Sequence, residues 1–482
     1  MPSCQLCNWS QSGAQESGVQ PHLAACGKLI DLTTGSTKVG AVDDQVDEGN
    51  GNSLLSPFAI GLIVGVVVIT FILTWTSALR RPFLDDDWSY LNTVQQSGWW
   101  HASAVWDPHN GLYRPVLFLW FGLLHSVFGL HPLGYHIATL AVVFLVGFLT
   151  WRIALTAGLK RGALVAGAVV LLHAAVVYPV SWTAAASSPI SVAFGLGAIL
   201  VLLNRPVTLP WGVVAALLLA LGLLTREVVI VAPIIVVIVA WARPTGTLKD
   251  ALLRSIPVWV ADVGYVVLRV ASGAGNPPGP YHQEVSGHAL NNFFSLIVRA
   301  SDVSGISAQL RTLAITGLFF FMMGTLVWSL VRRKYVVLAG LAWFVVATLP
   351  VIFLVNHYME TYYIDFALPG LALAFGASCE LVAERVSDRI AIVAGVLLLV
   401  ILGLVGHAVA TTQFTHEYGA DVAETQRLLA HVDRYHPNPA VGPELILVHV
   451  IPSAADEEAV TQNGNFFRVV LHDPALRVRL DH

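Results

Sequence analysis

The chain has 482 residues, of which 56% are apolar and 12% are charged, and its mean hydropathy is +0.69. A soluble protein carries about 25% charged residues, so this composition excludes a soluble globular enzyme and a disordered chain. The net charge of −4 argues against a nucleic-acid-binding protein, and the count of four cysteines excludes a disulfide-stapled module. The composition predicts an all-α polytopic membrane protein.

The first 53 residues are polar and include five acidic residues between Asp31 and Glu48. They lack the basic start and the short apolar core of a signal peptide. We therefore predict a disordered cytoplasmic tail over residues 1–53.

Apolar stretches long enough to cross a bilayer follow from residue 54 onward. Windows of about 19 residues predict about eleven spans, at residues 54–78, 134–157, 162–178, 185–203, 209–224, 227–242, 256–271, 312–331, 335–355, 362–383 and 390–412. The apolar stretch at 115–128 is too short for a crossing and begins at Pro115, a residue typical of a first helical turn. We expect this stretch to form a helix that lies at the membrane interface.

The Lys and Arg residues of the short loops predict the orientation of the spans. With the N-terminus in the cytoplasm, eleven of these residues fall in cytoplasmic turns: Lys160, Arg161, Arg205, Arg243, Lys249, Arg254, Arg332, Arg333, Lys334, Arg385 and Arg389. The opposite loops hold five: Arg80, Arg81, Arg114, Arg226 and Arg299. The asymmetry favours a cytoplasmic N-terminus and an extracytoplasmic C-terminus.

With this orientation the spans form a membrane domain over residues 54–412, and three outer regions are larger than turns. The first outer loop covers residues 79–133. The second covers 272–310 and opens with the Gly- and Pro-rich sequence GAGNPPGPYHQE, which is typical of a loop. The third, 413–482, is predicted to be a small C-terminal α/β domain with one buried strand in ELILVHVIP.

Three consecutive carboxylates, Asp85, Asp86 and Asp87, come directly after the first span and precede Trp88. Neighbouring carboxylates raise one another's pKa, so a protein keeps such a cluster where a base, a metal or a cationic partner needs it. The alternative is a solvated loop whose charges merely end the span. Trp88 and the other tryptophans of this loop are either interface anchors or surfaces on which a sugar stacks.

Two further clusters carry positive charge. Arg114 precedes the interfacial stretch, which also leads to His131 and His136, and an Arg there either binds a phosphate or extends to lipid headgroups. Arg226 and Glu227 lie between two spans with almost no loop. An ionisable pair at a membrane boundary indicates a functional site, and the alternative is an ion pair that locks the helix hairpin.

The last cluster is polar and lies between the spans at 335–355 and 362–383. Its members are Asn356, His357, Glu360, Tyr362, Tyr363 and Asp365. A turn does not require this many polar groups, although tyrosines are also typical of the membrane interface.

Taken in order, these motifs resemble the GT-C superfamily of membrane glycosyltransferases. The resemblance is closest to the protein O-mannosyltransferases and the tetratricopeptide-bearing mannosyltransferases. It rests on the sequences DDDW, YRPVLFLWFGLLHSVFGLHPLGYH, HAAVVYPVSWTAAASS, LLTREVVIVAP and NHYMETYY followed by LPG, and covers about 54–412. The chain departs from these relatives in having no tetratricopeptide repeats, Thr361 where an Arg often follows the Glu, and a short outer tail.

The resemblance implies an outward cavity, a polyprenyl-phosphate-linked sugar as donor and a first-loop Asp as catalytic base. Within the triplet of Asp85, Asp86 and Asp87, Asp86 and Asp87 match the base best, and we choose Asp86. The resemblance implies that Arg226 and His357 face the donor phosphate and that Glu360 lies at the cavity floor. From the clusters described above we add Arg114 as a predicted phosphate residue and Glu227, Tyr363 and Trp88 as predicted cavity residues.

The sequence therefore predicts a multi-pass plasma-membrane glycosyltransferase that acts on the extracytoplasmic face. A carrier for lipid-linked or anionic solutes and a non-catalytic scaffold of the same fold are the alternatives. The acceptor is left open among a glycan, a lipid and a protein, and the Asp cluster leaves a divalent cation open as a cofactor. The Ala-, Val-, Leu- and Gly-rich composition indicates a GC-rich genome such as that of an actinobacterium, where arabinose or mannose on decaprenyl phosphate would be the donor.

Overall fold

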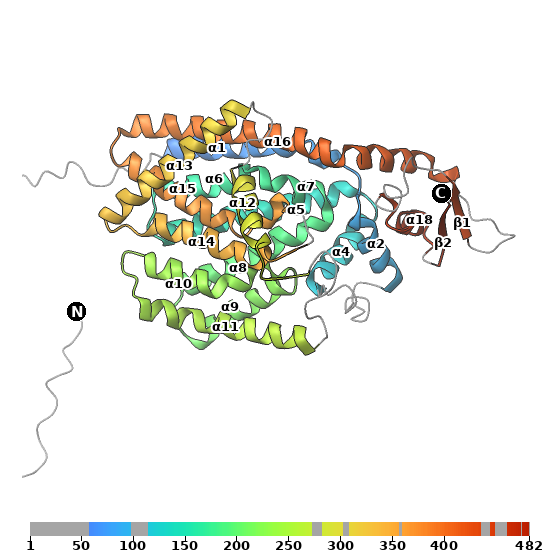
Figure 1. Cartoon of the computed structure of the whole chain (residues 1–482), viewed down its shortest axis with the longest axis horizontal. Helices are drawn as coiled ribbons and strands as arrows, with labels where there is room; N and C mark the ends of the chain where they lie inside the picture. Colours follow the sequence, from blue (N-terminus) through green and yellow to red (C-terminus); the bar gives the residue numbers. More distant parts are fainter. Residues whose placement is uncertain are drawn as a thin grey trace, which may run out of the picture. The chain divides into compact units, whose positions relative to one another are not determined.

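The structure is a computed structural model that describes residues 57–97, 114–271, 282–301, 308–355, 359–434, 444–448, 460–473 and 475–481. All of these residues belong to one unit, Leu55–His482, which is held together by its own contacts. Helices dominate this unit, and two short strands lie near its C-terminus (Figure 1).

Each predicted span coincides with helical structure. The helices are α1 Pro57–Trp75, α5 Pro132–Thr156, α6 Arg161–Leu172, α8 Ser187–Asn204, α9 Leu209–Leu223, α10 Ala232–Ala242, α11 Leu248–Ala271, α13 Ala308–Val331, α14 Val336–Ile352, α15 Leu368–Ala383 and α16 Asp388–His431. The predicted interfacial helix is α4, Pro115–Phe128, and Pro115 is in its first turn as expected. A further helix, α12 His288–Ala300, lies in the second predicted outer loop.

Fewer helices than the eleven predicted spans are by themselves both long and apolar enough to cross a membrane. Within the described residues, four helical segments are long and apolar enough to cross a membrane, or five if the bent pair formed by α6 and residues 174–181 counts as one span. The remaining apolar helices have 10–17 residues. Several of them are short because the chain leaves α-helical geometry before it reaches the end of the apolar stretch.

These interruptions are 3-10 turns and one short helix, and they gather at one end of the bundle. They are η2 Ala174–Val176, α7 Val177–Ser181, η3 Thr183–Ala186, η4 Glu227–Val231 and η5 Thr361–Ile364. The first interruption has a local cause, because the ring of His173 accepts the backbone N–H of Ala175 at 3.1 Å and so ends α6. Short 3-10 segments within helical proteins often mark functional regions.

The turns rich in Lys and Arg meet at the opposite end. A side-chain nitrogen of Arg243 donates to the carbonyl of Leu203 at 2.8 Å, and the Lys334 ammonium pairs with Glu384 at 2.5 Å. The carboxylate of Glu380 accepts the backbone N–H of Gly162 at 2.6 Å. These contacts join the turns that the positive-inside rule assigns to a single side.

Close helix packing at this end depends on two glycines. A Cβ at Gly162 of α6 would lie 2.0 Å from the carbonyl oxygen of Gly376 on α15. Small residues at such crossings let two helices approach closely, which is how helices pack in a membrane without a hydrophobic driving force between them.

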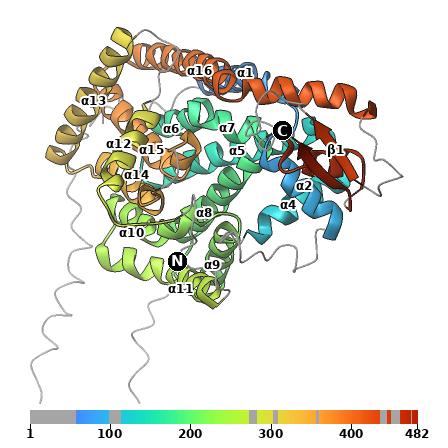
Figure 2. The ribbon, with the colours of Figure 1, turned by 45° about the vertical axis from the view of Figure 1, so that its right-hand side comes forward.

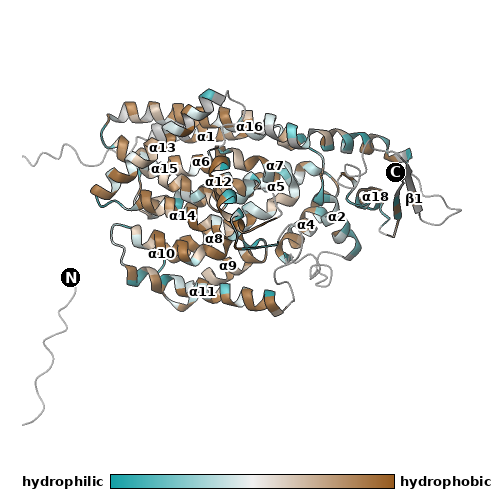
Figure 3. Ribbon diagram, in the orientation of Figure 1, coloured by the Kyte–Doolittle hydropathy of each residue, from teal (hydrophilic) through white to brown (hydrophobic). Residues whose placement is uncertain are grey.

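The C-terminal region is built on the long helix α16, which has 44 residues and continues well past the predicted span (Figure 2). The boundary expected at residue 413 therefore lies inside a helix. Beyond α16, strand β1 Glu444–Val448 pairs in parallel with β2 Arg477–Asp481, which confirms the strand predicted in ELILVHVIP. The part of α16 that approaches these strands is more hydrophilic than the part beside α1 (Figure 3).

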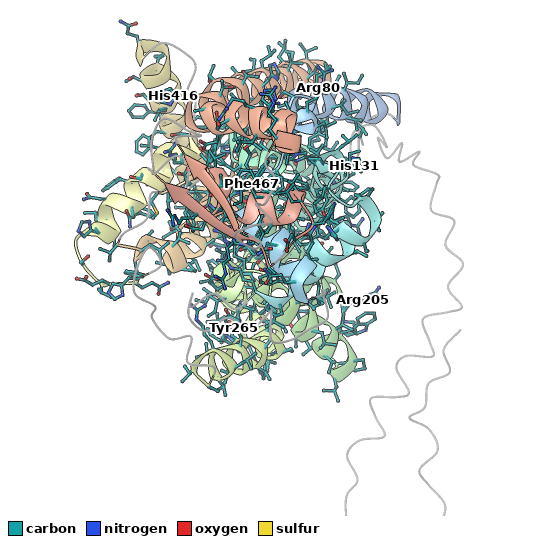
Figure 4. The ribbon with its side chains drawn as sticks, turned by 90° about the vertical axis from the view of Figure 1, so that its right-hand side faces the viewer. Arg80, His131, Arg205, Tyr265, His416 and Phe467 are labelled. Atoms are coloured by element: carbon teal, nitrogen blue, oxygen red, sulfur yellow. The ribbon has the colours of Figure 1, made fainter. Side chains whose placement is uncertain are left out.

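An aromatic core joins this C-terminal region to the first outer loop. Helix α2, Asp86–Ser97, packs against the short helix α18, Asn465–Val470. The ring of Trp88 lies 4.9 Å from that of Phe466 and 5.5 Å from that of Phe83. Figure 4 looks onto this end of the structure, with Phe467 of α18 near the centre. The C-terminal strands and α18 therefore cover the segment that carries the three aspartates.

Candidate active site

The carboxylate of Asp87 ties the loop after α1 to η3. Its Oδ2 accepts the backbone N–H of Leu84 at 2.9 Å, and its Oδ1 accepts the backbone N–H of Ala184 at 2.6 Å. The side chain is fully buried. Burial raises the pKa of this carboxyl well above its usual value, although the hydrogen bonds from the backbone amides lower it. Both oxygens of Asp87 thus hold the backbone of the site together.

Asp85 is held by the C-terminal region. Its φ of 46° lies in the left-handed region, which residues other than glycine rarely adopt. Its carboxylate accepts a hydrogen bond from the side-chain amide of Gln462, a residue that itself has a φ of 49°. Burial, followed by the charges of Asp86 and Asp421, raises the pKa of Asp85 to about 7. Two backbone segments in unfavourable conformations therefore meet through one side-chain hydrogen bond, an arrangement that is typical of functional sites.

Asp86 is the first residue of α2, and its surroundings differ from those of Asp85 and Asp87. Its side chain is partly exposed, and its carboxylate makes no hydrogen bond to any residue in the described part of the chain. Burial raises the pKa of Asp86, and the positive charge of Arg114 opposes this shift. Of the three carboxylates, Asp86 is the one whose oxygens accept no hydrogen bond from the residues that the structure describes.

Arg114 places one positive charge between two carboxylates. Its Nη2 donates to Oε1 of Glu227 at 3.4 Å, and its charge also acts on Asp86. The next turn of backbone is fixed as well, since the N–H of Val116 donates to the carbonyl of Leu224 at 3.2 Å. Arg114 is buried, whereas the side chain of Glu227 is 26% exposed. This arrangement brings the first outer loop next to the junction of α9 and η4.

The structure does not show the alternative, an ion pair between Arg226 and Glu227. Glu227 pairs with Arg114 instead. Arg226 has an extended backbone, with φ −162° and ψ 135°. Successive side chains of an extended segment point to opposite sides, so the two neighbouring side chains diverge.

The guanidinium of Arg226 lies over two tyrosine rings. Its central carbon is 4.7 Å from the ring centroid of Tyr362 and 5.2 Å from that of Tyr363. Arg226 is 4% exposed and forms no ion pair with any residue that the structure describes. Stacking uses the face of the guanidinium and leaves the N–H groups at its edge for an anion. The sequence motifs around residues 226 and 360 are thus brought together.

Several buried polar atoms around these tyrosines have no hydrogen-bond partner among the described residues. They are Tyr178 Oη, Ser181 Oγ, Trp182 Nε1, Thr183 Oγ1, Thr361 Oγ1 and Asp365 Oδ2. The rings of Tyr178 and Trp182 lie 6.0 Å and 6.2 Å from that of Tyr362. Buried polar groups are nearly always hydrogen-bonded, so this group of hydroxyl, indole and carboxyl atoms indicates a place for a polar ligand or for water.

Other predicted residues have different positions. Trp88 is 1% exposed and packs in the aromatic core, so its ring supports α18 and is not on an open surface. His136 is buried, and its Nε2 lies 3.1 Å from the carbonyl oxygen of Arg81, while His131 precedes α5 and is exposed. Glu360 is partly buried directly before η5.

Asn356 and His357 lie outside the described residues, so the expected contact of His357 with a phosphate stays a prediction. Within the described part of the chain, no group of three or more His, Cys, Asp or Glu residues is arranged to hold a metal ion.

Sequence reasoning missed Gln462, and it included Tyr178 and Trp182 in a motif of the resemblance without assigning them to the site. Gln462 is 377 residues from Asp85 in the chain, and no local signal links the two. The sequence YPVSW does carry a signal, since Tyr178 and Trp182 surround a proline and serine within an otherwise apolar stretch. Polar and aromatic residues at that depth could have been included in the predicted site.

The structure is similar to two membrane glycosyltransferases. One is the archaeal oligosaccharyltransferase AglB from Archaeoglobus fulgidus in complex with an inhibitory peptide and a dolichol-phosphate, with 12% identity and a TM-score of 0.51. Its apo form gives 12% identity and a TM-score of 0.53. The other is ArnT from Cupriavidus metallidurans bound to undecaprenyl phosphate, with 16% identity and a TM-score of 0.52.

The matches cover 87%, 89% and 88% of this chain, respectively. The chain spans less than two thirds of the length of the oligosaccharyltransferase, 64% and 65%, and 90% of the length of ArnT. No protein-family model matches the sequence, and no curated protein sequence matches it either. The chain therefore has the GT-C fold, which confirms the predicted fold class. The finer resemblance to protein O-mannosyltransferases stays a prediction.

We predict that Asp87 is required for stability, whatever its part in the chemistry. Asp87→Ala leaves two buried backbone N–H groups without an acceptor, and each such group costs about 1–3 kcal/mol. The thermal unfolding temperature of the detergent-solubilised protein should fall clearly. Asp86→Ala is the matched control and should leave it nearly unchanged, because Asp86 makes no hydrogen bond to the described residues. Equal unfolding temperatures for the two variants would contradict this role of Asp87.

Proposed function

We propose that this protein is a membrane glycosyltransferase that transfers a sugar from a polyprenyl-phosphate-linked donor to an acceptor hydroxyl. The observation that carries the proposal is the position of Asp86, a carboxylate without a hydrogen bond to the described residues, at the same end of an apolar helical bundle as the buried Arg114 and Arg226. The similar structures support it, since one is in complex with a dolichol-phosphate and the other is bound to undecaprenyl phosphate.

In the proposed reaction, the acceptor oxygen attacks the anomeric carbon of the donor sugar. A new C–O bond forms, and the bond between the anomeric carbon and the phosphate oxygen breaks, so the polyprenyl phosphate leaves with the electron pair. Asp86 takes the proton of the acceptor hydroxyl as the general base. Burial raises the pKa of Asp86, which makes its carboxylate a stronger base than an ordinary aspartate.

The departing phosphate needs positive charge beside it. Arg226 is suited to this task, because its face is occupied by Tyr362 and Tyr363 while its N–H edge is left for an anion. Arg114 connects the two halves of the site through its pair with Glu227 and its charge effect on Asp86. His357 is proposed as a further phosphate contact. The hydroxyls of Ser181, Thr183 and Thr361 would then take the sugar hydroxyls as partners.

The proposed orientation places the active site outside the cell. The turns that hold Lys160, Arg254 and Arg333 lie at one end of the bundle, and the three aspartates lie at the other. The positive-inside rule assigns the first end to the cytoplasm. The N-terminus would be cytoplasmic, the C-terminal strands would be extracytoplasmic, and the protein would lie in the plasma membrane.

A carrier for lipid-linked or anionic solutes is the main alternative. Such a protein binds its substrate near the bilayer midplane with charged residues of broken helices. One buried carboxyl, Asp262 of α11, lies within a predicted span and has no hydrogen-bond partner among the described residues. The remaining site residues gather at one end of the bundle, which favours the transferase. A sugar such as arabinose or mannose and a glycan, lipid or protein acceptor are compatible with the proposed chemistry.

We predict the orientation from the charged turns. In a variant without the four native cysteines, Gln96→Cys and Leu429→Cys should react in whole cells with a maleimide that does not cross the membrane. Arg333→Cys should react only after the cells are opened. Labelling at position 333 in intact cells would overturn both the orientation and the outward active site.

We predict that Arg226→Ala weakens donor binding. A charge-assisted contact contributes about 1.5–3 kcal/mol, so affinity for the polyprenyl-phosphate sugar should fall roughly tenfold to a hundredfold. Titration calorimetry in detergent measures the affinity, and thermal unfolding checks the fold. Arg226→Lys retains the positive charge, so its affinity for the donor should fall less than that of Arg226→Ala. If Arg226→Ala binds the donor normally, the guanidinium has a structural role on the two tyrosines.

We predict that Asp86→Asn binds donor normally and fails in transfer. Loss of a general base costs about 10²–10⁴ in rate, because the amide keeps the shape of the carboxyl and cannot take the proton. Asp85→Asn is the matched control, since Asp85 is already bonded to Gln462. Near-normal transfer by Asp86→Asn together with an inactive Asp85→Asn would show that the wrong aspartate is assigned.

The same assignment gives a pH dependence. Transfer should increase with pH through the raised pKa of Asp86, because only the carboxylate accepts a proton. Arg114→Gln removes the charge that lowers this pKa, so the ascending limb should move to higher pH and the rate should recover there. If Arg114→Gln lowers the rate at every pH and leaves the ascending limb at the same pH, the electrostatic coupling between Arg114 and Asp86 is contradicted.

A further inference from the structure

A chain of side-chain hydrogen bonds connects the C-terminal region to the residue that precedes the proposed base. Helices α2 and α18 lie side by side, and polar side chains meet along their contact (Figure 1). Two of these side chains, Asp85 and Ser89, lie at the start of α2. Three others come from the C-terminal region at intervals of three residues: Gln462, Asn465 and Arg468.

The hydrogen bonds of this chain all run in one direction. Nη1 of Arg468 donates to Oδ1 of Asn465 at 2.9 Å, and Nδ2 of Asn465 donates to Oγ of Ser89 at 3.0 Å. The Ser89 hydroxyl donates to Oε1 of Gln462 at 3.2 Å, and Nε2 of Gln462 donates to Oδ1 of Asp85. The chain therefore begins at a guanidinium and ends at a carboxylate. Hydrogen bonds in such a sequence polarise one another, so the earlier bonds strengthen the one that Asp85 accepts.

Asp85 depends on this bond, because its position is unfavourable in two ways. Burial and then the charges of Asp86 and of Asp421 on α16 raise the pKa of its carboxyl, whereas the hydrogen bond from Gln462 lowers it. Its φ of 46° lies in the left-handed region. A residue keeps such a conformation only where the surrounding structure holds it. In the described part of the chain, Gln462 is the residue that bonds to the Asp85 carboxylate.

The backbone of Asp85 in turn sets the position of Asp86. The carbonyl of Asp85 accepts the N–H of Trp88 at 3.1 Å, and the carbonyl of Leu84 accepts the N–H of Asp87 at 2.9 Å. These two bonds form the turn from which α2 begins at Asp86. A change in the conformation of Asp85 would therefore displace the carboxylate of Asp86.

The contact between α2 and α18 does not itself require the polar chain. The rings of Trp88 and Phe466 lie 4.9 Å apart, as do those of Phe466 and Phe467, and all three side chains are buried. Burial of apolar rings is favourable but has no direction, whereas a hydrogen bond constrains both distance and angle. The aromatic core therefore accounts for the attachment of α18, and the polar chain accounts for the orientation of the turn at Asp85.

We propose that Gln462 is a positioning residue of the transferase, which acts through Asp85 to fix the direction in which the Asp86 carboxylate meets the acceptor hydroxyl. The inference rests on the proposed function, in which Asp86 is the base. A base must lie within hydrogen-bond reach of the proton that it takes, and a misplacement of about 1 Å can lower a rate about a hundredfold. The C-terminal segment 460–473 thus completes the active site.

The first test measures the turn and needs no substrate. In the purified full-length Gln462→Leu variant, the backbone N–H groups of Asp87 and Trp88 should exchange with deuterium at least about tenfold faster than in the wild type, because a hydrogen bond to a charged group is lost. Helices α5 and α8 should exchange as before. Gln96→Leu is the matched control, since it makes the same chemical change at an exposed position of α2. It should leave exchange at the turn unchanged, and thermal unfolding checks that both variants are folded.

An exchange of the two interacting groups tests the specific pair. Gln462→Glu puts a second carboxylate beside Asp85, so exchange at the turn should increase. Asp85→Asn alone should have little effect on this exchange, because its amide oxygen still accepts from Gln462. With both substitutions, the amide at position 85 donates to the carboxylate at position 462, and exchange should return close to that of the wild type. If Gln462→Leu does not fold, this pair of substitutions provides the test.

The second test measures transfer. Membranes of cells that express each variant supply the acceptors, and the release of decaprenyl phosphate from decaprenyl-phosphate-linked arabinose or mannose is followed. Gln462→Leu should lower the maximal rate about tenfold to a hundredfold. The donor concentration that gives the half-maximal rate should not change, and neither should the affinity of the purified protein for undecaprenyl phosphate, because Arg226 keeps its place. Gln462→Glu combined with Asp85→Asn should recover most of the rate.

Two exchange results would overturn the positioning role of Gln462. They are unchanged exchange at Asp87 and Trp88 in a folded Gln462→Leu variant, and effects of Gln462→Glu and Asp85→Asn that only add. A normal maximal rate in Gln462→Leu would overturn its role in transfer. If the wild type releases decaprenyl phosphate from neither donor, the proposed function is in error, and the exchange results still decide whether Gln462 holds the turn.

Discussion

The arrangement of the candidate site depends on one buried carboxylate. Asp87 accepts one backbone N–H from its own loop and one from η3, and the second bond joins the loop after α1 to a segment 97 residues later in the chain. Each of these amides would otherwise be buried without a partner, which is costly in an apolar environment. Asp87 therefore fixes where α2 begins, and with it the positions of Asp85 and Asp86. The packing of Trp88 on Phe466 continues the same connection into the C-terminal region.

Three neighbouring carboxylates consequently have three different surroundings. Asp87 accepts two backbone N–H groups, and Asp85 accepts the side-chain amide of Gln462. Asp86 accepts no hydrogen bond from the described residues, and the positive charge of Arg114 acts on it. A site that must take a proton from a hydroxyl needs a carboxylate of the last kind. The neighbouring two make this possible because they hold the backbone around it in a conformation that it would not adopt alone, as the φ of 46° at Asp85 shows.

The two ends of the bundle have different chemistry for a common physical reason. Ionisable groups are costly within the apolar layer, so the polar contacts gather where the helices end. At one end the chain breaks into 3-10 turns that present Arg226, Tyr362 and the buried hydroxyls to one another. At the other end the turns carry Lys and Arg, and an apolar cavity opens beside Arg161. The proposed sugar donor combines a hydrocarbon chain with an anionic phosphate, which suits a site at such a boundary.

The sequence by itself determined the fold class, the positions of the helices, including the short one at 115–128, and the strand at 444–448, because each depends on local apolar patterning. It also identified the segments that carry Asp86, Arg114, Arg226 and Tyr363. The tertiary structure decided what the sequence left open: which aspartate is buried, that Glu227 pairs with Arg114 across 113 residues, and that Gln462 holds Asp85 across 377. It also shortened several predicted spans and extended α16 beyond residue 413. Local patterning cannot supply these facts, since hydrogen bonding and burial of a charged side chain depend on which distant segments meet.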